Sequence, residues 1–263
     1  MTDRRLSAAP ATPVAAGSPA LLLIAHGSRD PRHAAAVAAL VSRLRRLRPG
    51  LDVATAYLDH CAPRIPQVTA RLDRSAIAVP LLLNRAFHAK HDIPAALRAA
   101  GATLPVAEVL GPSPLLLAAL DRRLAEAAPE LASPAVRART GLVLAAAGSS
   151  DPAADAATRA VAAEWRRTRG WAAVEVAYAS ADGPRVPDAV AALRRTRAVD
   201  RVAVSPYLLA PGLLPDRIAE AATGAAADHL ADVLAPTPEL ARLLLTRYDE
   251  TRTTAETAPA LTA

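Results

Sequence analysis

Three polar side chains stand just after apolar runs in the first half of the sequence. His26 and Asp59 follow such runs at once, and His88 lies five residues beyond Leu83. If the runs are parallel strands, these side chains meet outside the carboxyl ends of one sheet, where ligand sites gather. Neutral imidazoles bind borderline divalent metals such as iron, cobalt and nickel, and they accept protons near neutral pH. We therefore expect an open metal site at His26 and His88, with Asp59 orienting an imidazole or receiving a proton.

The other histidines and the single cysteine are weaker candidates. His91 could be a third ligand or a solvent-facing helix start, and we favour the second interpretation. His60 lies beside Asp59 and could point either way, whereas His33 and His229 are interpreted as surface helix residues. Cys61 is interpreted as a small buried hydrophobic residue. The sequence has no HExxH motif and no paired CxxC motif, which argues against a permanent, closed zinc site.

The two halves of the chain repeat each other. The segment LLIAHGSRDP at Leu22–Pro31 returns 121 residues later as VLAAAGSSDP at Val143–Pro152. The same offset joins four further pairs: Tyr57 and Tyr178, Pro63 and Pro184, Arg64 and Arg185, and Pro66 and Pro187. The run AVPLLL at Ala78–Leu83 resembles VSPYLL at Val204–Leu209 at an offset of 126. A nearly constant offset over several motifs indicates an internal duplication.

The two copies share turn residues but not reactive ones. The shared pairs are Gly27 and Gly148, Ser28 and Ser149, Asp30 and Asp151, and Pro31 and Pro152. Glycine allows a tight turn, serine or aspartate can cap a helix, and proline suits its first position. The reactive positions change: His26 becomes Ala147, Asp59 becomes Ser180, and His88 falls near Leu213 or Leu214. We therefore expect one working half and one structural half.

Apolar runs and helical patterns alternate in both copies. In the first copy the runs lie at about 20–25, 52–58, 76–83 and 104–109, and the helical stretches at about 31–48, 64–74, 92–100 and 113–128. In the first helix a buried stripe is expected at helical spacing, made by Ala34, Val37, Leu40, Val41 and Leu44. Gly50 is expected to end that helix. The alternation predicts an α/β fold of two similar domains, each a parallel sheet flanked by helices.

These patterns also suggest domain boundaries. We expect a catalytic domain at 19–130, a linker at 131–139 and a degenerate second domain at 140–248. The Ala/Pro/Thr-rich start, 1–18, and the Thr/Ala-rich end, 249–263, are expected to be disordered tails.

Composition narrows the class of protein. The formal net charge is +6, and Lys90 is the only lysine, so nearly all positive charge is arginine. We interpret the arginines as solvated helix faces and expect no nucleic-acid binding, because aromatic residues for base stacking make up only 3%. One cysteine, no apolar run of membrane-spanning length and no signal-peptide pattern predict a cytoplasmic protein without a membrane segment.

The same motifs resemble a known family. LLLIAHGSRDPRHAAAVAAL and VPLLLNRAFHAKHDIPAAL are similar to the two histidine motifs of the sirohydrochlorin chelatases, the class II tetrapyrrole chelatases. YLDHCAPRIP is similar to that family's acidic segment, although Asp59 stands where glutamate is more usual. The resemblance covers about 19–248, and the duplicated length is similar to that of the long bacterial members.

The resemblance implies a metal-inserting enzyme. Members insert Fe2+ or Co2+ into sirohydrochlorin, on the route to siroheme or cobalamin, and their two histidines match His26 and His88. The substrate is a polycarboxylate, so the candidate carboxylate partners are the nearby basic residues Arg29, Arg32, Arg85 and Lys90, each of which could equally be a solvated charge. The metal is a substrate, and no permanent cofactor is expected. We expect a monomer, because duplication supplies two lobes within one chain.

Other functions remain open at this point. A metal or tetrapyrrole carrier on the same fold would bind ligand without turnover. A hydrolase with Ser28 as nucleophile is disfavoured, because the GxSxG elbow is missing and Ser149 persists in the half without histidine. A periplasmic-binding-like module would need an export signal, which we do not find.

Overall fold

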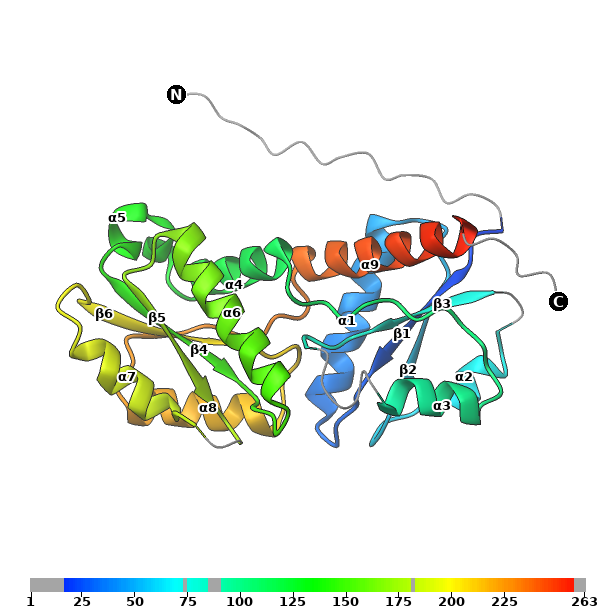
Figure 1. The fold of residues 1–263 in the computed structure, drawn as a ribbon, viewed down its shortest axis with the longest axis horizontal. Helices are drawn as coiled ribbons and strands as arrows, with labels where there is room; N and C mark the ends of the chain where they lie inside the picture. The colour runs from blue at the N-terminus through cyan, green and yellow to red at the C-terminus, as the bar shows by residue number, and fades with distance from the viewer. Residues whose placement is uncertain (1–16, 73–74, 85–90, 181–182, 258–263) are drawn as a thin grey trace, which may run out of the picture.

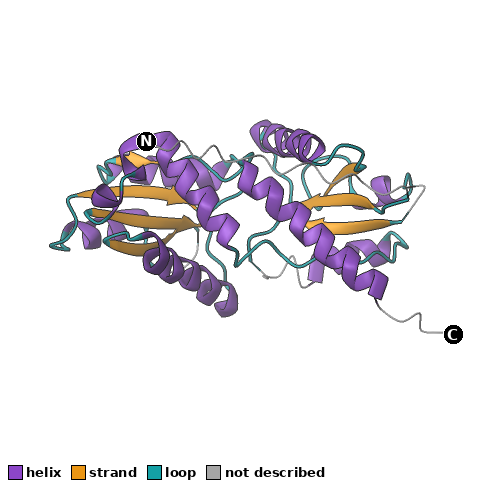
Figure 2. Cartoon of the chain, turned by 90° about the horizontal axis from the view of Figure 1, so that it is seen from above, coloured by secondary structure: helices purple, strands orange, loops and turns teal. Residues whose placement is uncertain are grey.

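The structure, a computed structural model, describes residues 17–72, 75–84, 91–180 and 183–257. Two parallel sheets lie side by side, each with helices on both faces (Figure 1 and Figure 2). This arrangement confirms the predicted fold class. None of the helices in the described part of the chain is both long and apolar enough to cross a bilayer.

The first sheet has the strand order β2-β1-β3, so the strand that leads to His26 lies in its centre. Its strands are β1 (Ala20–Ala25), β2 (Val53–Tyr57) and β3 (Ala76–Pro80). The helices of this part are α1 (Pro31–Leu47), α2 (Ile65–Thr69), α3 (Ile93–Ala99) and α4 (Pro114–Ala127). The run at 104–109, expected to be a fourth strand, makes only an isolated bridge between Ala78 and Val106.

The second sheet has the order β5-β4-β6-β7. Its strands are β4 (Thr140–Ala146), β5 (Ala173–Tyr178), β6 (Arg201–Pro206) and β7 (His229–Leu230). The main helices are α6 (Pro152–Arg169), α7 (Val186–Arg194), α8 (Leu213–Gly224) and α9 (Pro238–Thr257). Along the chain, the short helices η2 (Pro129–Ala132) and α5 (Pro134–Arg137) connect α4 to β4.

Strand register establishes the duplication residue by residue. In the first sheet Leu22 lies opposite Ala54 and Ala78, and in the second Val143 lies opposite Glu175 and Val204. These partners are related by the same offsets that relate the sequence motifs, 121 for the first two strands and 126 for the third. The two central strands therefore end at matching places, and the residues that follow them can be compared directly.

Helix α1 follows the predicted pattern. Val37, Leu40, Val41 and Leu44 are buried against the sheet, whereas Ala34, also expected in the stripe, is half-buried. The helix ends at Leu47, and the chain then turns through Gly50, whose positive φ of 85° favours glycine.

The last helix of each half packs mainly across the boundary between the halves. Helix α9, red in Figure 1, lies on α1 and β3 of the first half, while α4 contacts β6 and β7 of the second half. The Tyr248 hydroxyl donates a hydrogen bond to the Pro19 carbonyl at 2.6 Å, and Arg48 pairs with Asp249 at 2.5 Å. Each sheet is therefore covered partly by a helix that belongs in sequence to the other copy.

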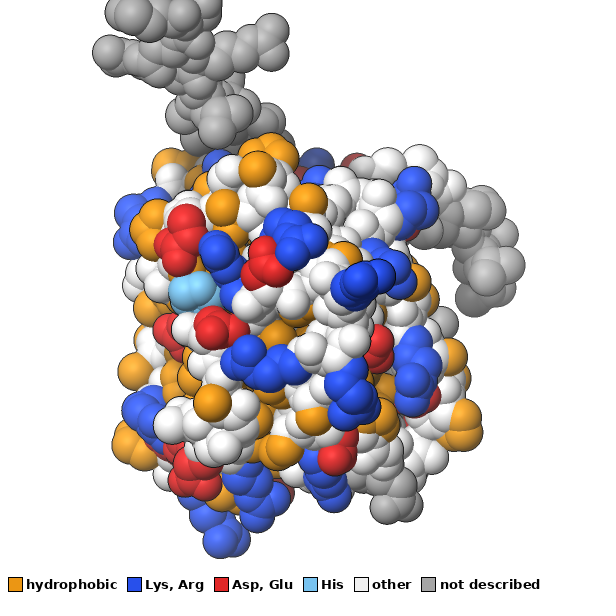
Figure 3. Space-filling model, turned by 90° about the vertical axis from the view of Figure 1, so that its left-hand side faces the viewer, with side chains coloured by type: hydrophobic (Ala, Val, Ile, Leu, Met, Phe, Trp, Pro, Cys, Tyr) orange, Lys and Arg blue, Asp and Glu red, His pale blue; other side chains and the backbone are white. Residues whose placement is uncertain are grey.

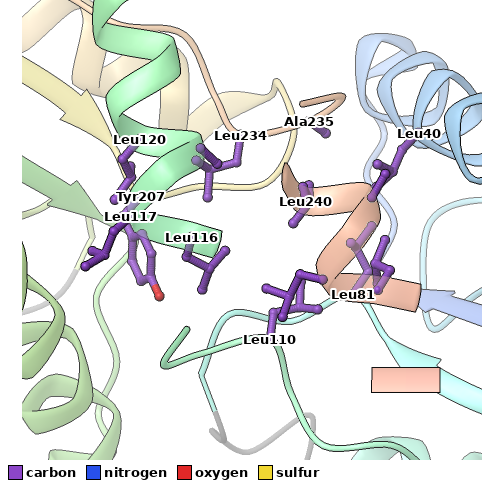
Figure 4. Packing of buried hydrophobic residues seen from close by; sticks show 14 of the residues in the cluster. Leu40, Leu81, Leu110, Leu116, Leu117, Leu120, Tyr207, Leu234, Ala235 and Leu240 are labelled. Atoms are coloured by element: carbon purple, nitrogen blue, oxygen red, sulfur yellow. The ribbon is translucent and has the colours of Figure 1, made fainter. Parts of the chain in front are cut away.

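This exchange produces one shared core. Leu23 of β1 and Leu144 of β4 belong to the same buried cluster, to which α4 and α9 contribute many side chains. Figure 4 shows leucines of α4 beside Tyr207, and Leu240 of α9 near Leu40 of α1. Separate apolar clusters lie on the opposite face of each sheet. The halves are thus joined through a continuous hydrophobic interior, which fixes the position of the space between them.

Four expectations about elements need correction or comment. The prediction of a disordered tail after Asp249 is wrong as far as Thr257, because α9 continues to that residue, held by the first-half contacts described above. The segment at 131–139 contains helical turns and a buried Leu131. His229, expected on a surface helix, lies in β7, where its Nε2 is 3.4 Å from Glu130. The expected tail at 1–18 lies almost wholly outside the described residues.

The arginines are distributed as solvated charges. On the end of the molecule that faces the viewer in Figure 3, basic side chains are interspersed with acidic and apolar ones. Many of them pair with carboxylates, as do Arg139 with Asp200 and Arg167 with Glu164.

Candidate active site

The turn after β1 brings His26 to the edge of the first sheet. Its side chain is half-buried, and its Nδ1 lies 3.1 Å from the Gly27 carbonyl oxygen. Gly27 has a φ of 95°, and a Cβ there would come 1.8 Å from the Asp59 carbonyl oxygen, so no larger residue fits. The loop after β2 packs against this turn, and the Asp59 amide donates to the His26 carbonyl at 2.8 Å. Glycine therefore allows two strand ends to meet beside the imidazole.

The residues after His26 form a helix cap. The Ser28 hydroxyl accepts a hydrogen bond from the Asp30 amide at 3.1 Å, and the Asp30 carboxylate caps α1. Ser149 and Asp151 make the same contacts in the second half. The cap role expected for these residues is confirmed, and it accounts for Ser28 without a nucleophilic function.

A pocket of about 620 Å³ lies between the two halves. Its first wall contains His26 and the segment after β3 that ends at Asn84. Its second wall contains the ends of β4, β5 and β6 and the start of α8. The strand ends of both sheets thus converge on one space, which is the position predicted for a ligand site in this class of fold.

Part of the predicted site lies outside the described residues. These are His88, Arg85 and Lys90, which directly follow Asn84. Asn84 itself lines the pocket and donates from Nδ2 to the Thr158 hydroxyl at 2.9 Å, so it joins the two walls. Asn84, the last described residue before this gap, therefore lies at the pocket. His91, where the described chain resumes, is exposed at the start of the helical segment, as expected.

Asp59 faces away from the pocket lining. Its side chain is 54% exposed and pairs with Arg64 at 3.1 Å, and His60 Nε2 lies 3.5 Å from its carboxylate. The hydrogen bond from the His60 amide is the main cause that lowers the pKa of Asp59, and Arg64 adds to it. The centroid of the His60 ring lies 6.3 Å from that of the His26 ring, so His60 is near both the carboxylate and the pocket histidine. In this arrangement Asp59 is an ionised group that orients His60 and Arg64.

The basic residues of the α1 turn differ in their surroundings. Arg29 is exposed. Arg32 pairs with Asp30 at 2.5 Å and with Asp216 of the second half at 2.6 Å, so two carboxylates already compensate its charge. Cys61 is half-buried against the main core, and its thiol donates to the Ser28 carbonyl at 2.9 Å. It is therefore only half-buried, not buried as expected, and its thiol holds the β2 loop against the turn.

His33 is a pocket residue that the sequence interpretation missed. It was expected on a solvated surface, but it is half-buried and lines the pocket together with His26. Burial, followed by the proximity of His26, lowers the pKa of His33. A signal was available, because His33 stands four residues before Val37 and so extends the buried stripe of α1 by one turn.

The second wall has apolar and phenolic residues where the first has imidazoles. Ala147 takes the position of His26, and Tyr207 takes that of Leu81. The Tyr178 hydroxyl donates to Asp155, whereas the Tyr207 hydroxyl is buried without a partner among the described residues. Burial raises the pKa of Tyr207, which keeps it protonated. The pocket thus places a basic, nitrogen-bearing wall opposite one that is mostly apolar.

Comparisons with known proteins agree with this architecture. The family model described as CbiX matches twice, at residues 20–127 and 141–251. A sirohydrochlorin ferrochelatase of Priestia megaterium is 30% identical over 212 residues, which cover 76% of this chain and 77% of the relative. A sirohydrochlorin cobaltochelatase of the same organism is 27% identical over 214 residues, 76% of this chain and 67% of the relative.

Solved structures share the fold. SirB from Bacillus subtilis with Fe3+ superimposes with a TM-score of 0.76 at 22% identity, over 91% of this chain and 98% of that one. A CbiX described as the terminal enzyme for siroheme biosynthesis in denitrifying bacteria gives 0.66 at 24% identity, over 90% and 99%. The family match spans most of the sequence and falls once on each half. This chain belongs to the CbiX family and carries two copies of the family's unit.

Proposed function

We propose that the chain is a sirohydrochlorin chelatase that inserts Fe2+ or Co2+ into the metal-free macrocycle. The observation that carries the proposal is the pocket between the halves, in which His26 faces a wall with no histidine among the described residues. The names of the two Priestia megaterium relatives, a ferrochelatase and a cobaltochelatase, support the same reaction class and both metals.

In this proposal the two walls have different tasks. The macrocycle enters between the halves, with one face toward the apolar second wall and the other toward His26. Burial of ring surface against Ala147, Leu208 and Leu209 provides binding energy that does not depend on the metal. The pocket holds the ring in one orientation, so that metal transfer becomes an event between two positioned groups.

The imidazoles of the first wall handle the metal and the protons. His26 and His88 hold the incoming ion while its hydration shell is exchanged for the ring nitrogens. Two of the four ring nitrogens carry a proton; each of these releases it on binding the ion, and a neutral imidazole can accept it. The two released protons balance the two charges of the ion. Asp59 contributes through His60, whose ring lies near both it and His26.

Basic residues around the turn bind the substrate's carboxylates. Of the four candidates, Arg29 is exposed and pairs with no carboxylate among the described residues, whereas Arg32 is shared between two aspartates. We therefore rank Arg29 above Arg32 and keep Arg85 and Lys90, which follow Asn84 at the pocket, as further candidates.

Organisation and location follow from the same observations. We assign the catalytic role to 19–130 and the wall-forming role to 140–248. Because α4 and α9 already cover the partner sheets within one chain, we propose a monomer. A single cysteine, held by the Ser28 carbonyl, fits a reducing cytoplasm.

A multiple-turnover assay tests the proposal. Purified protein is mixed with excess sirohydrochlorin and with Fe2+, Co2+ or Ni2+ in parallel, and insertion is followed by visible absorbance. We expect turnover with Fe2+ or Co2+ well above the rate without protein. Binding of the macrocycle without turnover would instead support a carrier on the same fold.

A further inference from the structure

His33 occupies an unusual position for a residue in the first turn of a helix. Its neighbour Arg32 is exposed, but the His33 side chain is turned inward and is half-buried. Its amide bonds to the Asp30 carbonyl at 3.1 Å, which fixes the start of α1. Because the rest of the helix packs its buried stripe on the sheet, the orientation of His33 is set by the fold and does not depend on a bound molecule.

Nδ1 of the His33 ring is buried and has no hydrogen-bond partner in the part of the chain that the structure describes. Buried polar atoms are normally paired, so one without a partner beside a pocket requires an explanation. The nearby Tyr57 ring, 6.3 Å away between centroids, supports the imidazole through packing. Within the described part of the chain no hydrogen bond of this nitrogen supports the fold, so it can bind a ligand.

The second half shows that a histidine is not needed at the His33 position for folding. The offset of 121 residues places Ala154 where the first half has His33, just as it places Ala147 where the first half has His26. Both alanines line the opposite wall of the same pocket. The cap residues around them are unchanged, so the turn and helix form without either imidazole. The two histidines thus differ between the halves together, while their scaffold stays constant.

From this juxtaposition we propose that His33 is a further metal-binding residue, which holds the incoming divalent ion with His26 on the first wall of the pocket. The inference rests on the proposed function and deepens it, because it names the side from which the ion approaches the macrocycle. In this proposal His33 stays with the metal until the ring nitrogens replace it.

Metal binding without the macrocycle tests this role. Co2+ is titrated into the wild-type protein and the His33→Ala variant, and binding is followed by calorimetry and by visible d–d absorption. We expect the Kd for Co2+ to rise about tenfold or more, in the range typical for lost metal-site residues. His229→Ala removes a half-buried histidine far from the pocket lining and is expected to keep the wild-type Kd. A Kd for His33→Ala within twofold of the wild type would overturn the inference.

A second measurement, which needs no variant, tests the same role in case His33→Ala does not fold. In the wild-type protein with 15N-labelled histidine, Zn2+ is added and the ring nitrogens are followed by NMR. We expect the His33 and His26 ring signals to shift together with one saturation curve, and a His33 signal that stays unchanged while His26 shifts would contradict the proposal.

The outcomes also separate the two claims. Metal insertion by the wild-type protein without a His33 response removes only this inference. A His33 response without any insertion removes the chelatase function.

Discussion

The two halves of this molecule share a backbone plan and differ in the side chains that face the pocket. Gly27 and Gly148 have φ values of 95° and 94°, and the helix that follows each is capped in the same way. Yet the position of His26 is occupied by Ala147 in the second half. The comparison teaches that turn and cap residues maintain the fold, whereas an imidazole at this position is not needed for it; we propose that the imidazole serves the chemistry.

The second half nevertheless forms part of the pocket. It provides the apolar wall, and its α9 covers the sheet that carries His26. In return α4 of the first half covers the second sheet. Because neither sheet is covered by its own helices alone, the halves are expected to unfold as one cooperative unit.

The largest expected effect comes from making the first half resemble the second. His26→Ala and His88→Ala should each lower the insertion rate at least a hundredfold, the scale of a lost acid–base group, to which the lost metal ligand adds. Initial rates from visible absorbance measure this, with circular dichroism to verify the fold.

The matched control changes the same position in the other half. Ala147→Ser should keep a rate close to that of the wild type, because this wall contributes contact surface only. Equal losses of insertion rate from His26→Ala and Ala147→Ser would contradict the proposal that the first half carries the chemistry and the second half only contact surface.

The next effect concerns the ion pair that joins α4 to α9. Glu239 is buried and receives two hydrogen bonds from Arg122, at 2.7 and 2.8 Å. Arg122→Ala leaves this carboxylate without its partner and should lower the free energy of unfolding by about 2 kcal/mol. Urea denaturation at pH 7 measures the loss. Arg167→Ala, which breaks an exposed pair with Glu164, should cost less than about 0.5 kcal/mol.

The same pair predicts a pH dependence. Burial alone would raise the pKa of Glu239, but the hydrogen bonds and charge of Arg122 outweigh it and lower the pKa below the ordinary 4.5. A lowered pKa in the folded state means that the pair stabilises fully above about pH 4.5 and loses this contribution as the pH falls further. The wild-type curve should therefore decline more steeply below that pH than the curve of Glu239→Gln. Parallel curves would show that the pair is not the cause.

A smaller effect is expected at the mouth of the pocket. Leu213 is 65% exposed, lines the pocket and falls near His88 when the halves are aligned. Burial of its side chain against the macrocycle would contribute about 1.5 kcal/mol, so Leu213→Ser should weaken tetrapyrrole binding about tenfold. Fluorescence titration measures the affinity. Val106→Ser removes the other large apolar side chain classed as exposed among the described residues, away from the pocket, and should leave binding unchanged.

The smallest effect concerns the bridge between the halves at the α1 turn. Arg32 and Asp216 are largely exposed, so Asp216→Ala should lower stability by less than about 1 kcal/mol. Because it releases Arg32 from one carboxylate, Asp216→Ala should not weaken tetrapyrrole binding. If Arg32→Ala weakens binding severalfold while Asp216→Ala does not, Arg32 binds the substrate. If both variants behave alike, Arg32 only bridges the halves.

Local sequence patterns predicted the strands, the caps and the duplication well. The sequence motifs align Leu22 with Val143. In the structure these two residues have equivalent partners on the neighbouring strand. The position of His26 at a strand end followed from the same logic. These features depend on residues close in sequence, where apolar periodicity and turn chemistry are informative.

Features that depend on distant contacts were not predictable in this way. The apolar face of α9 shows that the helix is buried but not which sheet it covers, so the exchange with α4 and the ordered segment after Asp249 were missed. His33 was missed for a different reason, because a polar residue in a first helical turn is usually solvated. The overlooked signal was that His33 lies on the same side of α1 as the buried Val37.

Anomalous diffraction at the cobalt edge, from crystals soaked in Co2+, tests the central claim most directly. The account predicts a cobalt peak within the pocket between the halves, about 2.1 Å from a ring nitrogen of His26, as is usual for imidazole ligands. A peak at Asp59 and His60 or at the exposed His91, with His26 unligated, would contradict it.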